Sequence, residues 1–189
     1  MKNLLIVLSL SVLFIGGCNS NLKQSSSKYK KIDTPFDASK YFSDKKHYRS
    51  TGEGKALDLN VAKRIAETNA RQAIASQIEV KVRSVGEQFL QNRSISNKLE
   101  TTSKYEDITR TVIDETLTNV KIIDQESFQN KKKSKGEYVH FVAMEMPTSS
   151  VLEKMTQKIS EDEQLKQDFD LNKFREIYEE EIEALKNGG

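Results

Sequence analysis

Apolar residues recur every three or four positions between residues 57 and 78, which is the period of one face of an α-helix. Most members of this stripe are alanine or isoleucine: Ala62, Ile65, Ala66, Asn69, Ala70, Ala73, Ile74 and Ile78. Asp58 or Asn60 would cap the start of the helix. Because alanine side chains are short, we expect this helix to lie close against a sheet.

Two strands are predicted on either side of that helix. Residues 46–51 predict a short strand, and Gly52 and Gly54 predict a sharp turn that closes it, since glycine adopts positive φ without steric cost. The glycine spacing there does not match a phosphate-binding loop. Residues 79–84 alternate valine with charged residues, which predicts a half-exposed strand.

A hairpin is predicted further along the chain, from residues 120–128 and 137–146. Its turn, residues 129–136, carries four lysines, which we expect to be solvated. The second strand is apolar on both faces, which predicts a central position in the sheet. His140 lies in this strand, where we expect a hydrogen-bonded, semi-buried side chain and not a catalyst.

The remaining segments are read as loop and helix. Residues 92–104 are polar and predict a loop, whereas residues 105–117 fit a helix. Ser150 and Glu153 have the spacing of a capping box, so a helix is expected to begin there. Its pattern continues to Lys186, with a break near residues 168–170.

The N-terminus has the features of an exported chain. The 12 residues of an apolar run, 4–15, would span about 18 Å as a helix, short of the ~30 Å bilayer core. The run therefore predicts a signal peptide and not a membrane span. Ile15, Gly16 and Gly17 then precede Cys18, the only cysteine. This order resembles the lipobox of bacterial lipoproteins, in which signal peptidase cuts before the cysteine and the cysteine is acylated.

The residues after Cys18 bear on location. Asn19 stands where an aspartate would retain a lipoprotein at the inner membrane under the enterobacterial sorting rule. We therefore expect an outer-membrane location, and the lack of acidic residues at positions 19–23, which in some lineages direct lipoproteins to the cell surface, favours the periplasmic face. Residues 19–31 are polar and lysine-rich and predict a flexible tether. The alternative to a lipobox is that the N-terminus is an ordinary signal peptide and that Cys18 is incidental.

Composition argues against several classes of function. Thirty basic residues oppose 28 acidic ones, a balance unlike that of nucleic-acid binders, and there is no tryptophan for base stacking. One cysteine and two histidines cannot build a Cys- or His-based metal site. No motif of a serine hydrolase or a zinc protease is present. We therefore expect no catalysis, no cofactor, no metal and no nucleic acid.

Charge is distributed unevenly along the chain. Residues 19–55 carry nine basic and four acidic side chains, whereas residues 161–183 carry ten acidic and three basic ones. These segments would complement each other within one chain or between subunits. The alternative is that both are simply solvated.

Residues 47–56 resemble a strand that ends in Gly52-x-Gly54-x-Ala56, and segments 70–78, 119–124 and 136–142 follow. This order resembles the Lpp-twenty family of bacterial lipoproteins, which includes relatives of flagellar protein P. The likeness covers about residues 41–146, and it departs from the family pattern where Val139 replaces a frequent aromatic residue. It implies an α+β domain on an outer-membrane lipid anchor, and it brings no catalytic residues.

Together these patterns predict an α+β protein with a small, mainly antiparallel sheet of three to four strands, a long alanine-rich helix against it and a C-terminal helical extension. We expect a signal peptide, a lipidated tether, an α+β domain and an acidic helical extension: residues 1–17, 18–37, 38–147 and 148–189. The expected function is a structural or interaction role for a lipid-anchored outer-membrane lipoprotein, as a homo-oligomer or with an envelope protein partner. The alternative is a periplasmic module that binds peptidoglycan or lipid.

Overall fold

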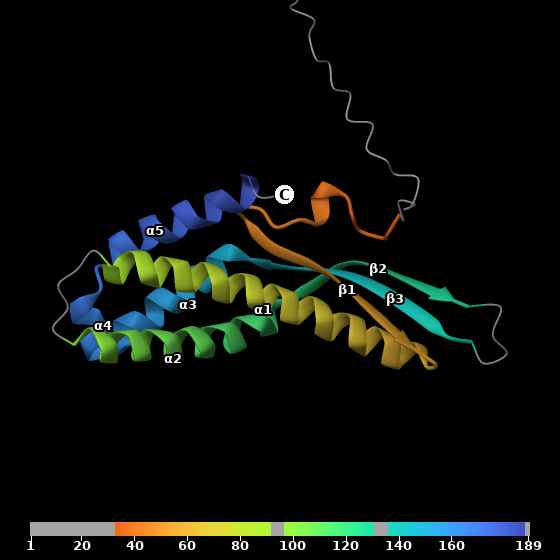
Figure 1. The fold of residues 1–189 in the computed structure, drawn as a ribbon, viewed down its shortest axis with the longest axis horizontal. Coiled ribbons are helices and arrows are strands. Elements are labelled where there is room, and N and C mark those ends of the chain that lie inside the picture. Colours follow the sequence, from red (N-terminus) through yellow and green to blue (C-terminus); the bar gives the residue numbers. More distant parts are fainter. Residues whose placement is uncertain (1–32, 92–96, 131–135, 188–189) are drawn as a thin grey trace, which may run out of the picture. The chain divides into compact units, whose positions relative to one another are not determined.

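The structure is a computed structural model that describes residues 33–91, 97–130 and 136–187. Residues 34–189 form one compact unit. Its main elements are β1 (His47–Ala56), α1 (Leu59–Gln91), α2 (Lys98–Thr116), β2 (Lys121–Gln129), β3 (Tyr138–Pro147), α3 (Thr148–Glu161), α4 (Glu163–Asp168) and α5 (Leu171–Glu183) (Figure 1). Short 3-10 turns occur at Ser39–Tyr41, Leu117–Asn119 and Ala184–Asn187.

The predicted α+β class and the hairpin are confirmed. The strands form one antiparallel sheet in the order β1-β3-β2, so β3 is central, as its apolar sequence predicts. The β1–β3 register runs from His47 opposite Pro147 to Ala56 opposite Tyr138. The β2–β3 register is regular from Asp124 opposite Ala143 onward, and a bulge precedes it.

The turn predicted at Gly52 and Gly54 is wrong, because β1 continues through both glycines. Both glycines instead allow the strand and the helix to approach each other closely. A Cβ on Gly52 would overlap the carbonyl oxygen of Ala66, and one on Gly54 would overlap that of Ala62. The alanine stripe of α1 therefore packs on the backbone of β1, as its short side chains predict.

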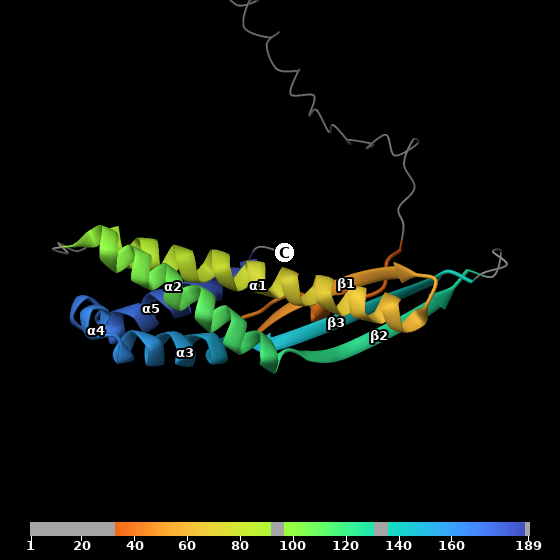
Figure 2. The same cartoon turned by 90° about the horizontal axis from the view of Figure 1, so that it is seen from below.

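The strand predicted at residues 79–84 is also wrong, since α1 extends to Gln91. Val82 is fully buried, one turn after Ile78, whereas Val80 is 66% exposed on the opposite side of the helix. The first part of α1 covers β1 and β3, and its later part runs beyond the sheet beside α2 and α5 (Figure 2). Asp58 caps its start by accepting a hydrogen bond from the Val61 N–H at 3.0 Å.

The loop predicted at residues 92–104 is wrong in part, because α2 begins at Lys98; residues 92–96 lie outside the described residues. The helix predicted at residues 105–117 is confirmed. Gly86 of α1 lets the ring of Tyr105 pack directly on the helix backbone. The Tyr105 hydroxyl donates to the Val82 carbonyl at 2.7 Å, so the buried phenol is satisfied.

The C-terminal helices share one core with α1, α2 and the sheet. Phe169, between α4 and α5, stacks on Phe89 and Tyr105 at centroid distances of 4.3 and 5.5 Å. The break predicted near residues 168–170 is confirmed, and Asp170 caps α5. The capping box predicted at Ser150 is wrong. Helix α3 begins at Thr148, directly after Pro147 ends β3, so Ser150 already lies in the first turn.

Candidate functional site

The N-terminal arm, which we define as residues 33–46, directly precedes β1. Its aromatic residues Phe36 and Tyr41 pack on Ala143, on the face of the sheet opposite α1. The Tyr41 hydroxyl donates to Asp124 Oδ2 of β2 at 2.5 Å. The arm therefore contacts both β3 and β2. The predicted lipidation site, Cys18, and the residues Ile15, Gly16 and Gly17 lie outside the described residues.

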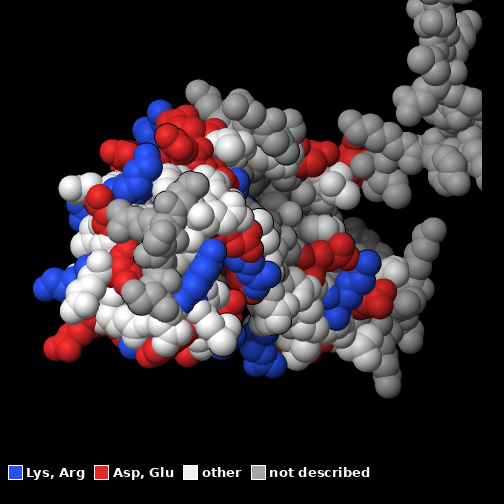
Figure 3. Space-filling view, turned by 60° about the vertical axis from the view of Figure 1, so that its left-hand side comes forward, with Lys and Arg blue, Asp and Glu red and all other residues white. Residues whose placement is uncertain are grey.

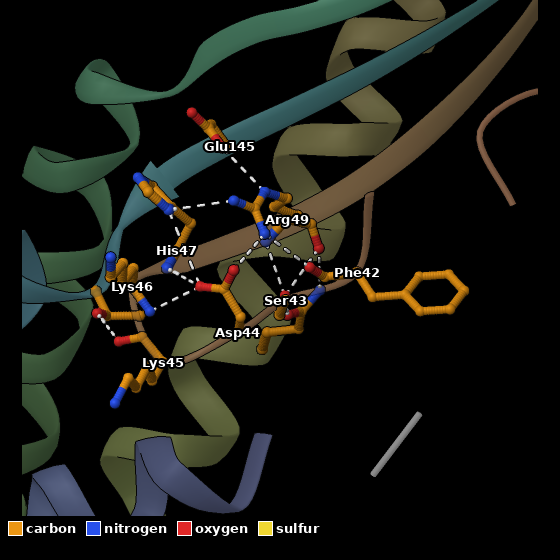
Figure 4. Close-up of polar contacts among 10 residues, drawn as sticks. Phe42, Ser43, Asp44, Lys45, Lys46, His47, Arg49 and Glu145 are labelled. Carbon is orange, nitrogen blue, oxygen red and sulfur yellow. Dashed lines mark hydrogen bonds and ion pairs between the residues drawn. The ribbon is translucent and has the colours of Figure 1, made fainter. Parts of the chain in front are cut away.

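Arg49 of β1 fastens the end of this arm to the sheet (Figure 4). Its Nε donates to Glu145 Oε2 on β3 at 2.9 Å. One terminal nitrogen donates to Asp44 Oδ2 at 2.7 Å and to the Phe42 carbonyl at 3.1 Å. The other lies 3.2 Å from His47 Nδ1. Four of the five guanidinium N–H groups are thus engaged, which leaves no free pair for bidentate binding of an anion.

The electrostatics of this cluster also point to a structural role. Burial opposes ionisation of Asp44, but hydrogen bonds from Arg49 and from two backbone N–H groups outweigh it, so the pKa of Asp44 is lowered. No sequence pattern predicted this cluster. In the sequence, only the charges of Asp44, Arg49 and Glu145 could have pointed to it. The β1–β3 register is what places Arg49 opposite Glu145.

The outer edge of β1 is closed by side chains of the same molecule. Ser43 Oγ binds both the N–H and the carbonyl of Arg49, at 2.7 and 3.0 Å. Gln77 of α1 donates to the same carbonyl at 3.0 Å, and Asn69 of α1 donates to the Glu53 carbonyl at 2.8 Å. These bonds occupy backbone groups that an added strand would need. We call this the closed edge.

The outer edge of β2 is different. Every residue of β2 except Asp124 is exposed, and none of the described helices packs closely on the strand. Among the described residues, the outward backbone groups of β2 make one side-chain hydrogen bond, from the Gln125 N–H to Asp124 Oδ1 at 2.9 Å. We call residues 124–129, which pair regularly with β3, the open edge.

Exposed apolar side chains accompany this edge. Phe128 is 48% exposed, and its ring packs in a T-shaped arrangement on that of Phe141 of β3, with the ring centroids 5.9 Å apart. Ile122 and Ile123 are exposed at the start of the strand. A half-exposed phenylalanine beside an unpaired strand edge is typical of surfaces that bind other chains. The lysines of the hairpin turn, residues 131–135, lie outside the described residues.

His140 is hydrogen-bonded, as predicted, but it is fully buried and not semi-buried. Its Nδ1 lies 2.8 Å from Ser127 Oγ on the neighbouring strand. Burial lowers the pKa of His140, and the positive charge of Lys63 lowers it further, against a raising effect of Glu67. Neither His140 nor Ser127 lines the grooves described next. We assign this pair as a structural hydrogen bond that satisfies the buried imidazole.

Two grooves lie on the helical part of the molecule. A groove of about 180 Å³ runs between α1 and α2, with Leu90, Tyr105 and Ile113 among its lining residues. Another, of about 260 Å³, lies beside Lys45 and Glu183, whose side chains form an ion pair at 3.3 Å. Both are smaller than the ~300–1,000 Å³ of typical small-molecule pockets.

The acidic C-terminal segment forms ion pairs within the chain. Lys81 of α1 pairs with Glu181 of α5 at 3.1 Å, and Lys45 of the arm pairs with Glu183. In the face shown in Figure 3, basic and acidic side chains are interspersed. Part of the charge complementarity expected between the two ends of the chain is therefore realised inside one molecule.

Within the described ranges, no group of three or more His, Cys, Asp or Glu residues is arranged to hold a metal ion. None of the described helices is long and apolar enough to cross a membrane. Neither the scan against protein-family models nor the searches of curated proteins and solved structures found a match to this chain.

Proposed function

We propose that the protein is a lipid-anchored lipoprotein of the bacterial outer membrane, on the periplasmic face, with a structural or interaction role and no catalysis. The observation that carries the proposal is the sequence Ile15-Gly16-Gly17-Cys18 directly after an apolar run too short to span a bilayer. A single acyl chain binds membranes only marginally, so the two or three chains of a bacterial lipoprotein would make the anchor stable.

The described part of the chain supports an interaction role in two ways. Arg49, which makes the most polar contacts in the cluster, is engaged with groups of the same molecule and leaves no free donor pair for an anionic ligand. The open edge of β2, in contrast, presents backbone and apolar groups to solvent. The likeness to the Lpp-twenty family rests largely on Gly52, Gly54 and the alanines of α1, which are packing positions, and it therefore supports a fold more than a partner.

The test of the anchor is acylation. The wild-type chain, Cys18→Ser and the matched control Ser20→Ala are expressed with a clickable fatty acid, and membranes are separated from soluble protein. We expect label and membrane association in the wild type and the control, and loss of both in Cys18→Ser. Label that persists in Cys18→Ser contradicts the proposal. Asn19→Asp tests the sorting, since it is expected to move the protein to the inner membrane.

A periplasmic binding module for peptidoglycan or lipid is the second candidate. The groove between α1 and α2 favours it, because apolar residues line it together with Arg83 and Arg110. Its small volume and the pairing of Arg83 with Glu79 and of Arg110 with Asp107 make it the weaker candidate. Binding of peptidoglycan fragments that is lost in Leu90→Glu but retained in Ile122→Glu would favour this function.

A further inference from the structure

We propose that the open edge of β2 binds an extended segment of another protein, which adds to the sheet as a fourth strand and carries a basic side chain opposite Glu126. This inference deepens the interaction role proposed above by assigning its surface and the chemistry of its partner. Strand addition of this kind takes affinity from main-chain hydrogen bonds and specificity from alternate side chains.

The backbone of the open edge is suited to an added strand. Residues 124–129 pair with β3 without interruption and contain no proline or glycine. The Gln125 N–H bonds to a neighbouring carboxylate and not to β3, so it points away from the sheet. The closed edge of β1 is occupied by Ser43, Gln77 and Asn69. Strand addition is therefore directed to β2.

The side chains of the open edge define the partner. Asp124, Glu126 and Phe128 alternate along β2 and so share one face of the sheet. Glu126 makes no ion pair among the described residues, whereas Asp124 already accepts the Tyr41 hydroxyl. A partner strand with Lys or Arg opposite Glu126 would supply the missing charge, and an apolar residue two positions away would cover Phe128.

The same acids disfavour a second copy of this chain. Antiparallel pairing of two β2 strands centred on Glu126 would place the two Glu126 carboxylates opposite each other. Pairing centred on Gln125 would place Asp124 opposite Glu126. Like charges directly opposed across strands are destabilising, so these two registers of self-pairing are disfavoured, whereas a basic strand would meet Glu126 favourably.

The experiment uses the full chain, purified in detergent, and three capped peptides. One is Thr-Lys-Thr-Val-Thr-Lys-Thr, in which valine stands two positions from each lysine on the same face, one has glutamate in place of each lysine, and one is the lysine peptide N-methylated at alternate backbone nitrogens. Hydrogen exchange of residues 124–129 reports strand addition, and NMR titration reports affinity. We expect protection and binding with the lysine peptide alone, since N-methylation removes the main-chain donors.

Three variants test the residues. Gln125→Pro removes an outward N–H and leaves the bonds to β3, so it should abolish binding. Glu126→Lys should weaken the lysine peptide about two- to five-fold and favour the glutamate peptide. Glu53→Lys, on the closed edge, is the matched control and should bind as the wild type does. If Gln125→Pro fails to fold, the N-methylated peptide applies the same test without a substitution.

Several results would overturn the inference. These are equal binding of the lysine and glutamate peptides, undiminished binding of the N-methylated peptide, or an unchanged preference in Glu126→Lys. Protection of β2 that rises with protein concentration alone would assign the edge to a second copy. Binding seen only after deletion of residues 19–31 would assign it to the chain's own tether. Because acylation of Cys18 is measured separately, each proposal can fail without the other.

Discussion

Gly54 of β1 faces the carbonyl oxygen of Ala62 in α1 so closely that a methyl group on the glycine would overlap it. One turn further along the helix, Gly52 stands in the same relation to Ala66. Strand and helix thus meet backbone to backbone at two successive points. Neither backbone can move aside as a side chain can, which makes these contacts sensitive to the smallest substitution.

We therefore expect Gly52→Ala and Gly54→Ala each to lower the free energy of unfolding by about 1–3 kcal/mol or more, as overpacking does. Urea denaturation followed by circular dichroism measures this. Gly136→Ala is the matched control, because its new Cβ meets only the flexible side chain of Gln129. Equal stability of all three variants would contradict the close approach.

Leucine substitutions at Ala66 and Ala73 should differ in their effect on the free energy of unfolding. Ala66 is fully buried against β1, whereas Ala73 is half-buried. Ala66→Leu is expected to cost about 1–3 kcal/mol of unfolding free energy, and Ala73→Leu clearly less. Thermal unfolding of the two variants side by side tests the assignment, and a larger loss in Ala73→Leu would mean that the face of α1 is wrongly placed.

The attachment of the N-terminal arm should weaken even in Arg49→Lys, because lysine keeps the charge but lacks the planar set of donors. Since hydrogen bonds to charged groups contribute about 1.5–3 kcal/mol each, Arg49→Lys should loosen the N-terminal arm measurably. Limited proteolysis between residues 33 and 46 is expected to become faster. Arg83→Lys, which changes an exposed arginine paired with Glu79, should leave both proteolysis and stability unchanged.

His140 should make stability depend on pH. Burial lowers its pKa in the folded state below the ordinary value of 6.5, so the unfolded chain binds a proton first as the pH falls. The free energy of unfolding should therefore decline below about pH 6.5, until the folded imidazole is protonated as well. We expect a shallower decline in His140→Gln. NMR titration of the ring gives the pKa directly, and a value above 6.5 would contradict this prediction.

Local patterns predict the hairpin and the alanine helix because their periodicity extends over many residues. They mislead at residues 79–84, where Val80 and Val82 alternate as in a strand. Val82 is buried by packing from distant residues such as Tyr105, which no local pattern reveals. Gly52 and Gly54 mislead for a similar reason, since the same residue type serves a turn or a close contact.

Part of the candidate surface can be predicted from the sequence. The hairpin and the central position of the second strand together imply that β2 lies at an edge. That this edge is open, and that of β1 closed, depends on single side chains such as Ser43 and Gln77, which reach Arg49 from elsewhere in the sequence. Their effect is visible only once the arm and α1 are placed on the sheet.

The N-terminal arm has a mechanical consequence if the protein is held by its N-terminus, as proposed above. Tension on the chain ahead of Asp33 would reach the contacts of Phe36 and Tyr41 with Ala143 first, together with the Tyr41–Asp124 hydrogen bond. Only after these had yielded would the ion pairs of Arg49 bear load, and only then the ten residue pairs between β1 and β3. Under such tension the contacts of the arm would be loaded before the pairing of the sheet.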